Sequence, residues 1–107
     1  MSYETISPAQ LAEQIKSGEA LRLIDVREPV EYEIARIAGA ELLPLSRFNE
    51  WAHRLNTEER IVVMCHHGIR SAQVCAMLAQ GGFDKLYNLA GGIDRWSQEV
   101  DGSVPRY

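Results

Sequence analysis

The predicted fold depends most on the segment Ile61-Val62-Val63-Met64-Cys65-His66-His67-Gly68-Ile69-Arg70-Ser71. Its first four residues are apolar and three of them are β-branched, which predicts a strand buried on both faces. Good helix formers continue from Arg70 to Gln80, with apolar residues three and four apart, and Gly81-Gly82 predicts the end of that helix. Cys65 therefore lies between the end of a strand and the start of a helix.

The six residues from Cys65 to Arg70 form a candidate anion-binding loop. A loop that leads into a helix directs backbone N–H groups inward and adds the positive end of the helix dipole. Such a cradle favours the thiolate of a cysteine, which is its nucleophilic form. Gly68 permits a backbone conformation that most residues resist, and the planar guanidinium of Arg70 suits a tetrahedral oxyanion. We take Cys65 as the candidate catalytic residue, and the candidate substrate-binding residues are His66, His67, Gly68, Ile69 and Arg70.

Cys65 and the two histidines after it also have simpler structural interpretations. A free cysteine at the end of an apolar strand is, taken alone, more often a core residue than a nucleophile. Here a glycine three residues on, an arginine five residues on and a helix start favour the nucleophile. His66 and His67 can also be read as solvent-facing loop residues. With the distant His53 they do not give the spacing of a zinc site, so we expect no metal.

Four segments of the chain together resemble the rhodanese sulfurtransferases. They are Leu23-Ile24-Asp25-Val26-Arg27-Glu28-Pro29-x-Glu31-Tyr32, Gly39-Ala40, Cys65-x-x-Gly68-x-Arg70-Ser71 and Asn88-Leu89-x-Gly91-Gly92-Ile93-x-x-Trp96. The resemblance extends from about Ile6 to Trp96 and is greatest to the single-domain members. One segment departs from the family, which usually has Gly-His-Ile-Pro-Gly-Ala where this chain has Ala35, Arg36 and Ala38 in place of the first Gly, the His and the Pro.

The resemblance implies an α/β fold, the rhodanese-like one, with a central parallel five-stranded sheet and helices on both faces. It implies one rhodanese domain over residues 5–103. The residue pattern agrees, because strands that alternate with helices indicate a parallel sheet covered on both faces. Beyond the central strand, we predict strands at 21–26, 41–43 and 83–89, and helical segments at 8–16, 28–33, 46–55 and 93–100.

Several finer expectations accompany these elements. Leu11 and Ile15 should share one core-facing stripe of the first helix, and Ser46 should cap a helix that buries Phe48, Trp51 and Leu55. Asp25 and Arg27, at the end of a strand, should tie down a loop. Residues 101–107 show no periodicity and are expected to be extended or frayed.

Composition limits the classes of function. A chain of 107 residues with 46% hydrophobic content suits one domain that buries a core without disulfides or metal. The net charge of −4 argues against binding to nucleic acid or to an anionic membrane, since both need a basic surface. Cys65 and Cys75 are too few for a disulfide framework. With no leader pattern and no membrane-spanning run, we expect a cytoplasmic protein.

The predicted activity is that of a thiosulfate sulfurtransferase. Sulfane sulfur would pass from thiosulfate or a similar small anionic donor to cyanide or a small-molecule or protein thiol, through a persulfide on Cys65 and without a cofactor. Two other classes remain open. Phosphatases and arsenate reductases use a similar Cys-to-Arg loop, which is one residue longer in the cell-cycle phosphatases. Non-catalytic binding modules share the rhodanese fold but commonly lack the cysteine.

Overall fold

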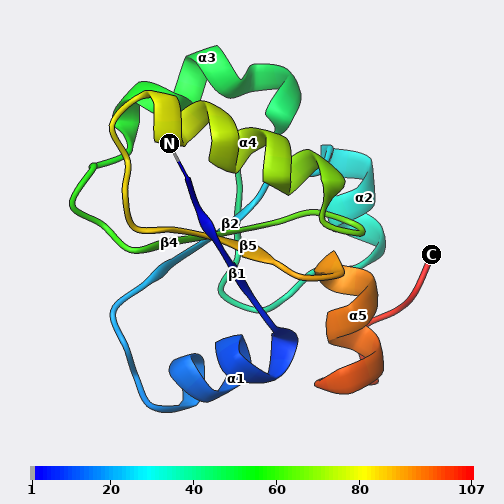
Figure 1. Cartoon of the computed structure of the whole chain (residues 1–107). Coiled ribbons are helices and arrows are strands. Elements are labelled where there is room, and N and C mark those ends of the chain that lie inside the picture. Colours follow the sequence, from blue (N-terminus) through cyan, green and yellow to red (C-terminus); the bar gives the residue numbers. More distant parts are fainter. Residues whose placement is uncertain (1) are drawn as a thin grey trace.

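The computed structural model describes residues 2–107 and has one five-stranded sheet in which all strands are parallel (Figure 1). The strand order is β1-β5-β4-β2-β3. The strands are β1 (Glu4–Ile6), β2 (Arg22–Asp25), β3 (Glu41–Leu42), β4 (Ile61–Met64) and β5 (Leu86–Leu89). The expected α/β architecture is therefore confirmed. The short strand β1 adds an edge that the sequence pattern did not predict.

Helices cover both faces of the sheet. In Figure 1, α1 (Pro8–Lys16) and α5 (Gly92–Glu99) lie below it, and α3 (Phe48–Trp51) and α4 (Ile69–Gln80) lie above it. The short helix α2 (Pro29–Ile34) follows β2. No helix within residues 2–107 has the length and apolar character needed to cross a membrane.

Strand β4 lies at the centre of the sheet, between β2 and β5. All four of its side chains are fully buried. Ile61 and Val63 belong to the core cluster that includes α4, whereas Val62 and Met64 belong to the cluster that includes α1 and α5. This placement explains the continuous apolar run, because a strand covered on both faces has no solvent-facing side.

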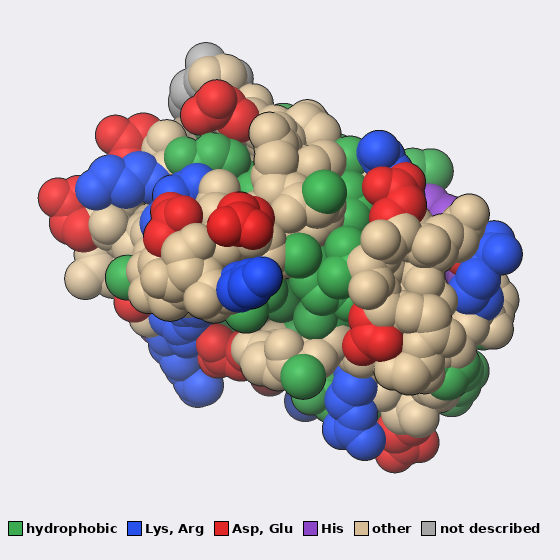
Figure 2. Space-filling model, turned by 90° about the horizontal axis from the view of Figure 1, so that it is seen from below, with side chains coloured by type: hydrophobic (Ala, Val, Ile, Leu, Met, Phe, Trp, Pro, Cys, Tyr) green, Lys and Arg blue, Asp and Glu red, His purple; other side chains and the backbone are tan. Residues whose placement is uncertain are grey.

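The first helix begins as expected and departs from expectation at its end. The Ser7 hydroxyl accepts from the Gln10 amide and the Gln10 side chain accepts from the Ser7 amide, which completes a capping box. Leu11 is fully buried, but Ile15 is 44% exposed. Ile15 borders a shallow groove of about 210 Å³. Figure 2 shows this side of the molecule, where hydrophobic side chains lie between charged ones.

The predicted helix at 46–55 is broken into three short pieces. A 3-10 turn at Leu45–Arg47 precedes α3, and a second one at Ala52–Arg54 follows it. Ser46 does not cap a helix, because its hydroxyl donates to Glu28. The Trp51 indole donates to the Pro44 carbonyl at 2.8 Å, which draws the segment back onto the end of β3. Burial of Trp51 and Leu55 is confirmed, whereas Phe48 is only partly buried.

The tail at 101–107 is packed against the domain, so the expectation of a frayed end is wrong. Val104 is only 8% exposed and belongs to the core cluster below the sheet. The buried Ser97 hydroxyl of α5 donates to the Val104 carbonyl. Arg106 and Tyr107 contact residues around the Cys65 loop, as described below. A single buried valine gives no periodic pattern, which explains why the sequence did not reveal it.

Candidate active site

Cys65 lies where β4 ends, at the carboxyl edge of the sheet. Its sulfur accepts from the Gly68 amide at 3.1 Å and from the Ser71 amide at 3.4 Å. The loop thus bends around the thiol and directs two backbone N–H groups at it, and α4 begins at Ile69. Although Cys65 is only 1% exposed, its sulfur has polar donors around it. A core cysteine packed by apolar groups alone would have none.

Ser71 and Asn88 support the loop from inside the protein. The Ser71 hydroxyl lies 3.3 Å from Cys65 Sγ and donates to Asn88 Oδ1. Asn88 Nδ2 in turn donates to the Gly68 carbonyl at 3.1 Å. Because these bonds orient the Asn88 amide, the Ser71 hydroxyl proton points away from the sulfur. When Cys65 is protonated, its S–H group can donate a hydrogen bond to the Ser71 oxygen.

Two glycines let the loop and helix α5 approach each other. Gly68 has φ of +102°, which side-chain-bearing residues rarely adopt. At Gly92 a Cβ would overlap the carbonyl oxygens of both Cys65 and His66. The next two amides of α5, those of Ile93 and Asp94, donate to the same two carbonyls at 2.9 and 3.2 Å. The start of α5 therefore fixes the backbone of Cys65 and His66.

Arg70, the last residue of the loop, is paired with Glu31 of α2. Its two terminal nitrogens donate to the two Glu31 carboxylate oxygens at 2.6 and 2.9 Å. Hydrogen bonding to Arg70 is the main reason that the pKa of Glu31 falls to about 2. The Glu31 carboxylate is thus ionised at neutral pH. Arg70, the cation that we expected to face the substrate, is therefore paired with a carboxylate of the same protein.

Asp25, the last residue of β2, forms a fully buried ion pair with Arg27. Arg27 Nη2 donates to Asp25 Oδ2 at 2.7 Å and to the Ala35 carbonyl at 2.6 Å. The pair ties the α2 loop to the sheet, as expected of it. In the segment that departs from the family pattern, Arg36 lies over the Tyr32 ring, 4.8 Å from its centroid.

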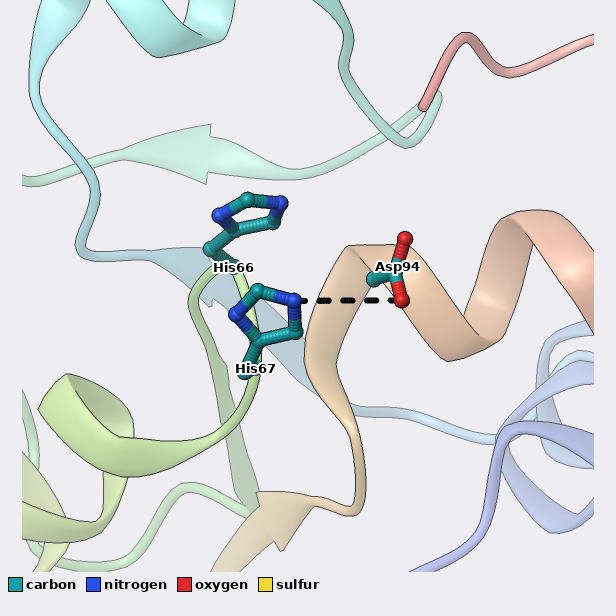
Figure 3. A group of neighbouring side chains, drawn as sticks. All are labelled: His66, His67 and Asp94. Carbon is teal, nitrogen blue, oxygen red and sulfur yellow. Dashed lines mark ion pairs between the residues drawn. The ribbon is translucent and has the colours of Figure 1, made fainter. Parts of the chain in front are cut away.

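His66, His67 and Asp94 form a polar group beside the loop (Figure 3). Their possible ligand atoms lie within 4.8 Å of one another, and His67 Nε2 is 3.8 Å from Asp94 Oδ2. The two imidazole rings stack with centroids 3.9 Å apart, so their nitrogen lone pairs lie in separate planes. Arg106 also donates to Asp94 Oδ1 at 2.8 Å. The Asp94 carboxylate therefore faces both His67 and Arg106.

Tyr107 joins the tail to the loop. Its ring stacks on His66 with centroids 3.9 Å apart and an interplanar angle of 7°. Its hydroxyl accepts from Arg27 Nη1 at 2.8 Å and donates to Glu31 Oε2 at 2.9 Å. Burial, with a smaller contribution from the charge of His67, holds the pKa of His66 below its usual value. Tyr107 thus links both ion pairs to the residue next to Cys65.

Cys75 lies within α4 and faces the core. It is fully buried, and desolvation raises the pKa of its thiol to about 12. Both cysteines are free thiols. Cys75 is therefore a poor nucleophile, in contrast to a thiol surrounded by amide donors.

Residues 7–99 match the family model of the rhodanese-like domain. The chain belongs to this family. A crystal structure of a rhodanese-related protein from Thermoplasma volcanium superposes with a TM-score of 0.82 at 36% identity, covering 92% of this chain and 94% of that one. The rhodanese fold inferred from the sequence is thereby confirmed.

Two curated rhodanese-like relatives illustrate the range of the family. The thiosulfate sulfurtransferase GlpE of Coxiella burnetii is 33% identical over 96 residues, which cover 90% of this chain and 89% of the relative. The chloroplastic rhodanese-like/PpiC domain-containing protein 12 of Arabidopsis thaliana is 46% identical over 90 residues, 80% of this chain. The chain spans only 30% of that protein's length.

The structure brings the six predicted loop residues together at one sheet edge. It adds to the site four residues that the sequence did not assign to it. The segments that resemble the family contain Ser71, Glu31 and Asn88. The sequence therefore held a motif that could have identified these three residues as part of the site. Tyr107 lies outside every such segment. It reaches the site because the tail is held by buried Val104 and by the bond from Arg106 to Asp94.

Proposed function

We propose that this rhodanese-like protein transfers sulfane sulfur through a persulfide on Cys65. The observation that carries the proposal is the ring of backbone around the thiol, with the Gly68 and Ser71 amides donating to Cys65 Sγ. Donors fixed in this way stabilise negative charge on sulfur without reorganising during the reaction. The same ring would hold a thiolate before transfer and the inner sulfur of a persulfide after it.

The proposed reaction has two steps. The Cys65 thiolate attacks the outer sulfur of thiosulfate or a similar small anionic donor. The sulfur–sulfur bond of the donor breaks, sulfite leaves with the bonding electrons, and the terminal sulfur on Cys65 keeps one negative charge. Cyanide, a small thiol or a protein thiol then attacks that terminal sulfur and regenerates the Cys65 thiolate. No cofactor takes part in either step.

The remaining loop residues would bind the donor through their backbone. The amides of His66, His67, Gly68, Ile69 and Arg70 lie in the loop and in the first turn of α4, a helix of twelve residues that begins at Ile69. Their partial positive charges and the helix dipole would attract the donor oxyanion. The ring has six residues, one fewer than in the related cell-cycle phosphatases, which favours a single sulfur atom over a phosphoryl group.

A steady-state assay of thiocyanate formation from thiosulfate and cyanide tests the proposal. We expect turnover by the wild-type protein, loss of at least about a thousandfold in Cys65→Ser, and little change in Cys75→Ala, the matched control. The same preparations should not hydrolyse an aryl phosphate. Thiocyanate formation that survives in Cys65→Ser, or aryl phosphate hydrolysis that needs Cys65, would overturn the assignment.

A further inference from the structure

Arg70 is the one loop side chain that bears a permanent positive charge, and that charge is compensated. Both terminal nitrogens of Arg70 donate to Glu31, whose side chain is only 17% exposed. Glu31 is also held from two other sides: the Glu28 amide donates to Oε1 and the Tyr107 hydroxyl donates to Oε2. The carboxylate is therefore a fixed part of the site.

The neighbouring arginines are compensated in the same way. Arg27 is buried against Asp25, and Arg106 donates to Asp94. The pKa of His66 is lowered, chiefly by burial, which disfavours a positive charge on its imidazole. Each of these three arginine–carboxylate pairs has no net charge, and ionisation of Cys65 adds one negative charge.

A donor with two negative charges meets an unfavourable field in such a site. Electrostatic energy scales with the donor charge, so repulsion by the thiolate is doubled for thiosulfate relative to a monoanion. A free Arg70 would offset this repulsion. Resting on the proposed function, we infer that Glu31 is a positioning residue that neutralises Arg70 and so makes the site favour monoanionic sulfur donors, such as thiosulfonates or alkyl persulfides, over the thiosulfate dianion.

Methanethiosulfonate and thiosulfate form a matched pair of donors for this inference. A methyl group replaces one oxygen, so the two differ little in size but carry one and two negative charges. The Cys65 thiolate attacks the outer sulfur of either donor, and the sulfur–sulfur bond breaks with its electrons on the leaving group. Methanesulfinate or sulfite departs, and the same Cys65 persulfide anion is formed.

The variant Glu31→Gln removes the negative charge that compensates Arg70, with little change in the shape of the side chain. The glutamine oxygen can still accept from the Glu28 amide, which preserves the cap of α2. Glu33→Gln, at an exposed glutamate of the same helix, is the control for the change in net charge. For both variants and the wild type, kcat and KM would be measured with each donor and a constant concentration of cyanide.

In the wild type, kcat/KM should be larger for methanethiosulfonate. Glu31→Gln should raise kcat/KM about threefold for methanethiosulfonate and about tenfold for thiosulfate, mainly through KM, because the energy gained doubles with donor charge. Glu33→Gln should change neither value by more than about twofold. Equal changes for both donors, or a loss for both, would overturn the inference.

Salt dependence in the wild type provides a second readout that does not rely on a variant. Added potassium chloride should leave kcat/KM for thiosulfate unchanged or raise it, since salt screens the repulsion. A steep fall in kcat/KM would indicate a net positive site and contradict the inference.

The same measurements separate the inference from the proposed function. If neither donor loads Cys65 in any variant, the proposed function itself fails. If both load it with the same charge preference in wild type and Glu31→Gln, only the role of Glu31 fails.

Discussion

Gly92 lies directly against the backbone of Cys65. A Cβ at position 92 would overlap the Cys65 carbonyl oxygen, and φ of Gly92 is +61°. The Ile93 amide, one residue on, donates to that same carbonyl. The Gly-Gly turn at the start of α5 and the loop around Cys65 therefore form one unit, although 27 positions separate Cys65 from Gly92.

Replacing Gly92 by alanine should disturb that unit. We expect Gly92→Ala to lower the free energy of unfolding by about 2–4 kcal/mol, because the new methyl group clashes with two carbonyls. Gly82 also has positive φ, but a Cβ added there would have no atom within 4 Å, so Gly82→Ala should cost only about 1 kcal/mol. Urea denaturation measures both values, and equal losses would argue against the close contact.

Ser71 is expected to contribute to stability through Asn88. In Ser71→Ala the Asn88 Oδ1 atom loses its donor in a buried position, which should cost about 1–3 kcal/mol. The exposed Ser103 provides a control, since Ser103→Ala removes a hydroxyl bond at the surface. Chemical denaturation of the two variants would show the difference. A Ser71→Ala protein as stable as wild type would mean that Asn88 finds another partner.

The pair of Glu31 and Arg70 predicts a specific dependence of stability on pH. The pKa of Glu31 is depressed from 4.5 to about 2 in the folded protein. The stabilisation is therefore complete above pH 4.5 and is lost as the pH falls toward 2. Because Arg70 is about one-third exposed, we expect about 1–2 kcal/mol.

Urea denaturation at several pH values measures this contribution. The difference in unfolding free energy between wild type and Glu31→Gln should be present at pH 6 and should shrink between pH 4.5 and 2. A difference that stays constant over this range would show that Glu31 acts by packing and not by charge.

Tyr107 should control the environment of His66. Tyr107→Phe keeps the stacked ring and should leave the His66 titration nearly unchanged, while removing the hydroxyl bonds to Arg27 and Glu31. Tyr107→Ala removes the ring as well, so the pKa of His66 should rise toward its usual value as burial is lost. Nuclear magnetic resonance of the imidazole follows this titration directly. Unchanged titration in Tyr107→Ala would place the cause of the shift elsewhere.

Local sequence patterns made the central elements predictable. The apolar run at 61–64 identified β4, and the Ser7 and Gln10 pair identified the start of α1. The family motifs located the loop around Cys65. Each of these features is local in sequence, so a single stretch contains the whole signal.

Features that depend on distant partners were not predictable in the same way. Strand β1 has three residues and is a strand because β5 pairs with it. The pairing of Arg70 with Glu31 joins residues 39 positions apart, and the contact of Tyr107 with Arg27 joins residues 80 apart. Only the folded chain shows that the expected substrate cation already has a carboxylate partner.

In the proposed reaction, Cys65 carries the transferred sulfur. Mass spectrometry of the intact protein after incubation with thiosulfate or methanethiosulfonate tests it most directly, with peptide mapping to locate the added mass. We predict one added sulfur atom on Cys65, none on Cys75, and its removal by cyanide. A protein that gains no sulfur from either donor, or that carries it on another residue, would contradict the account.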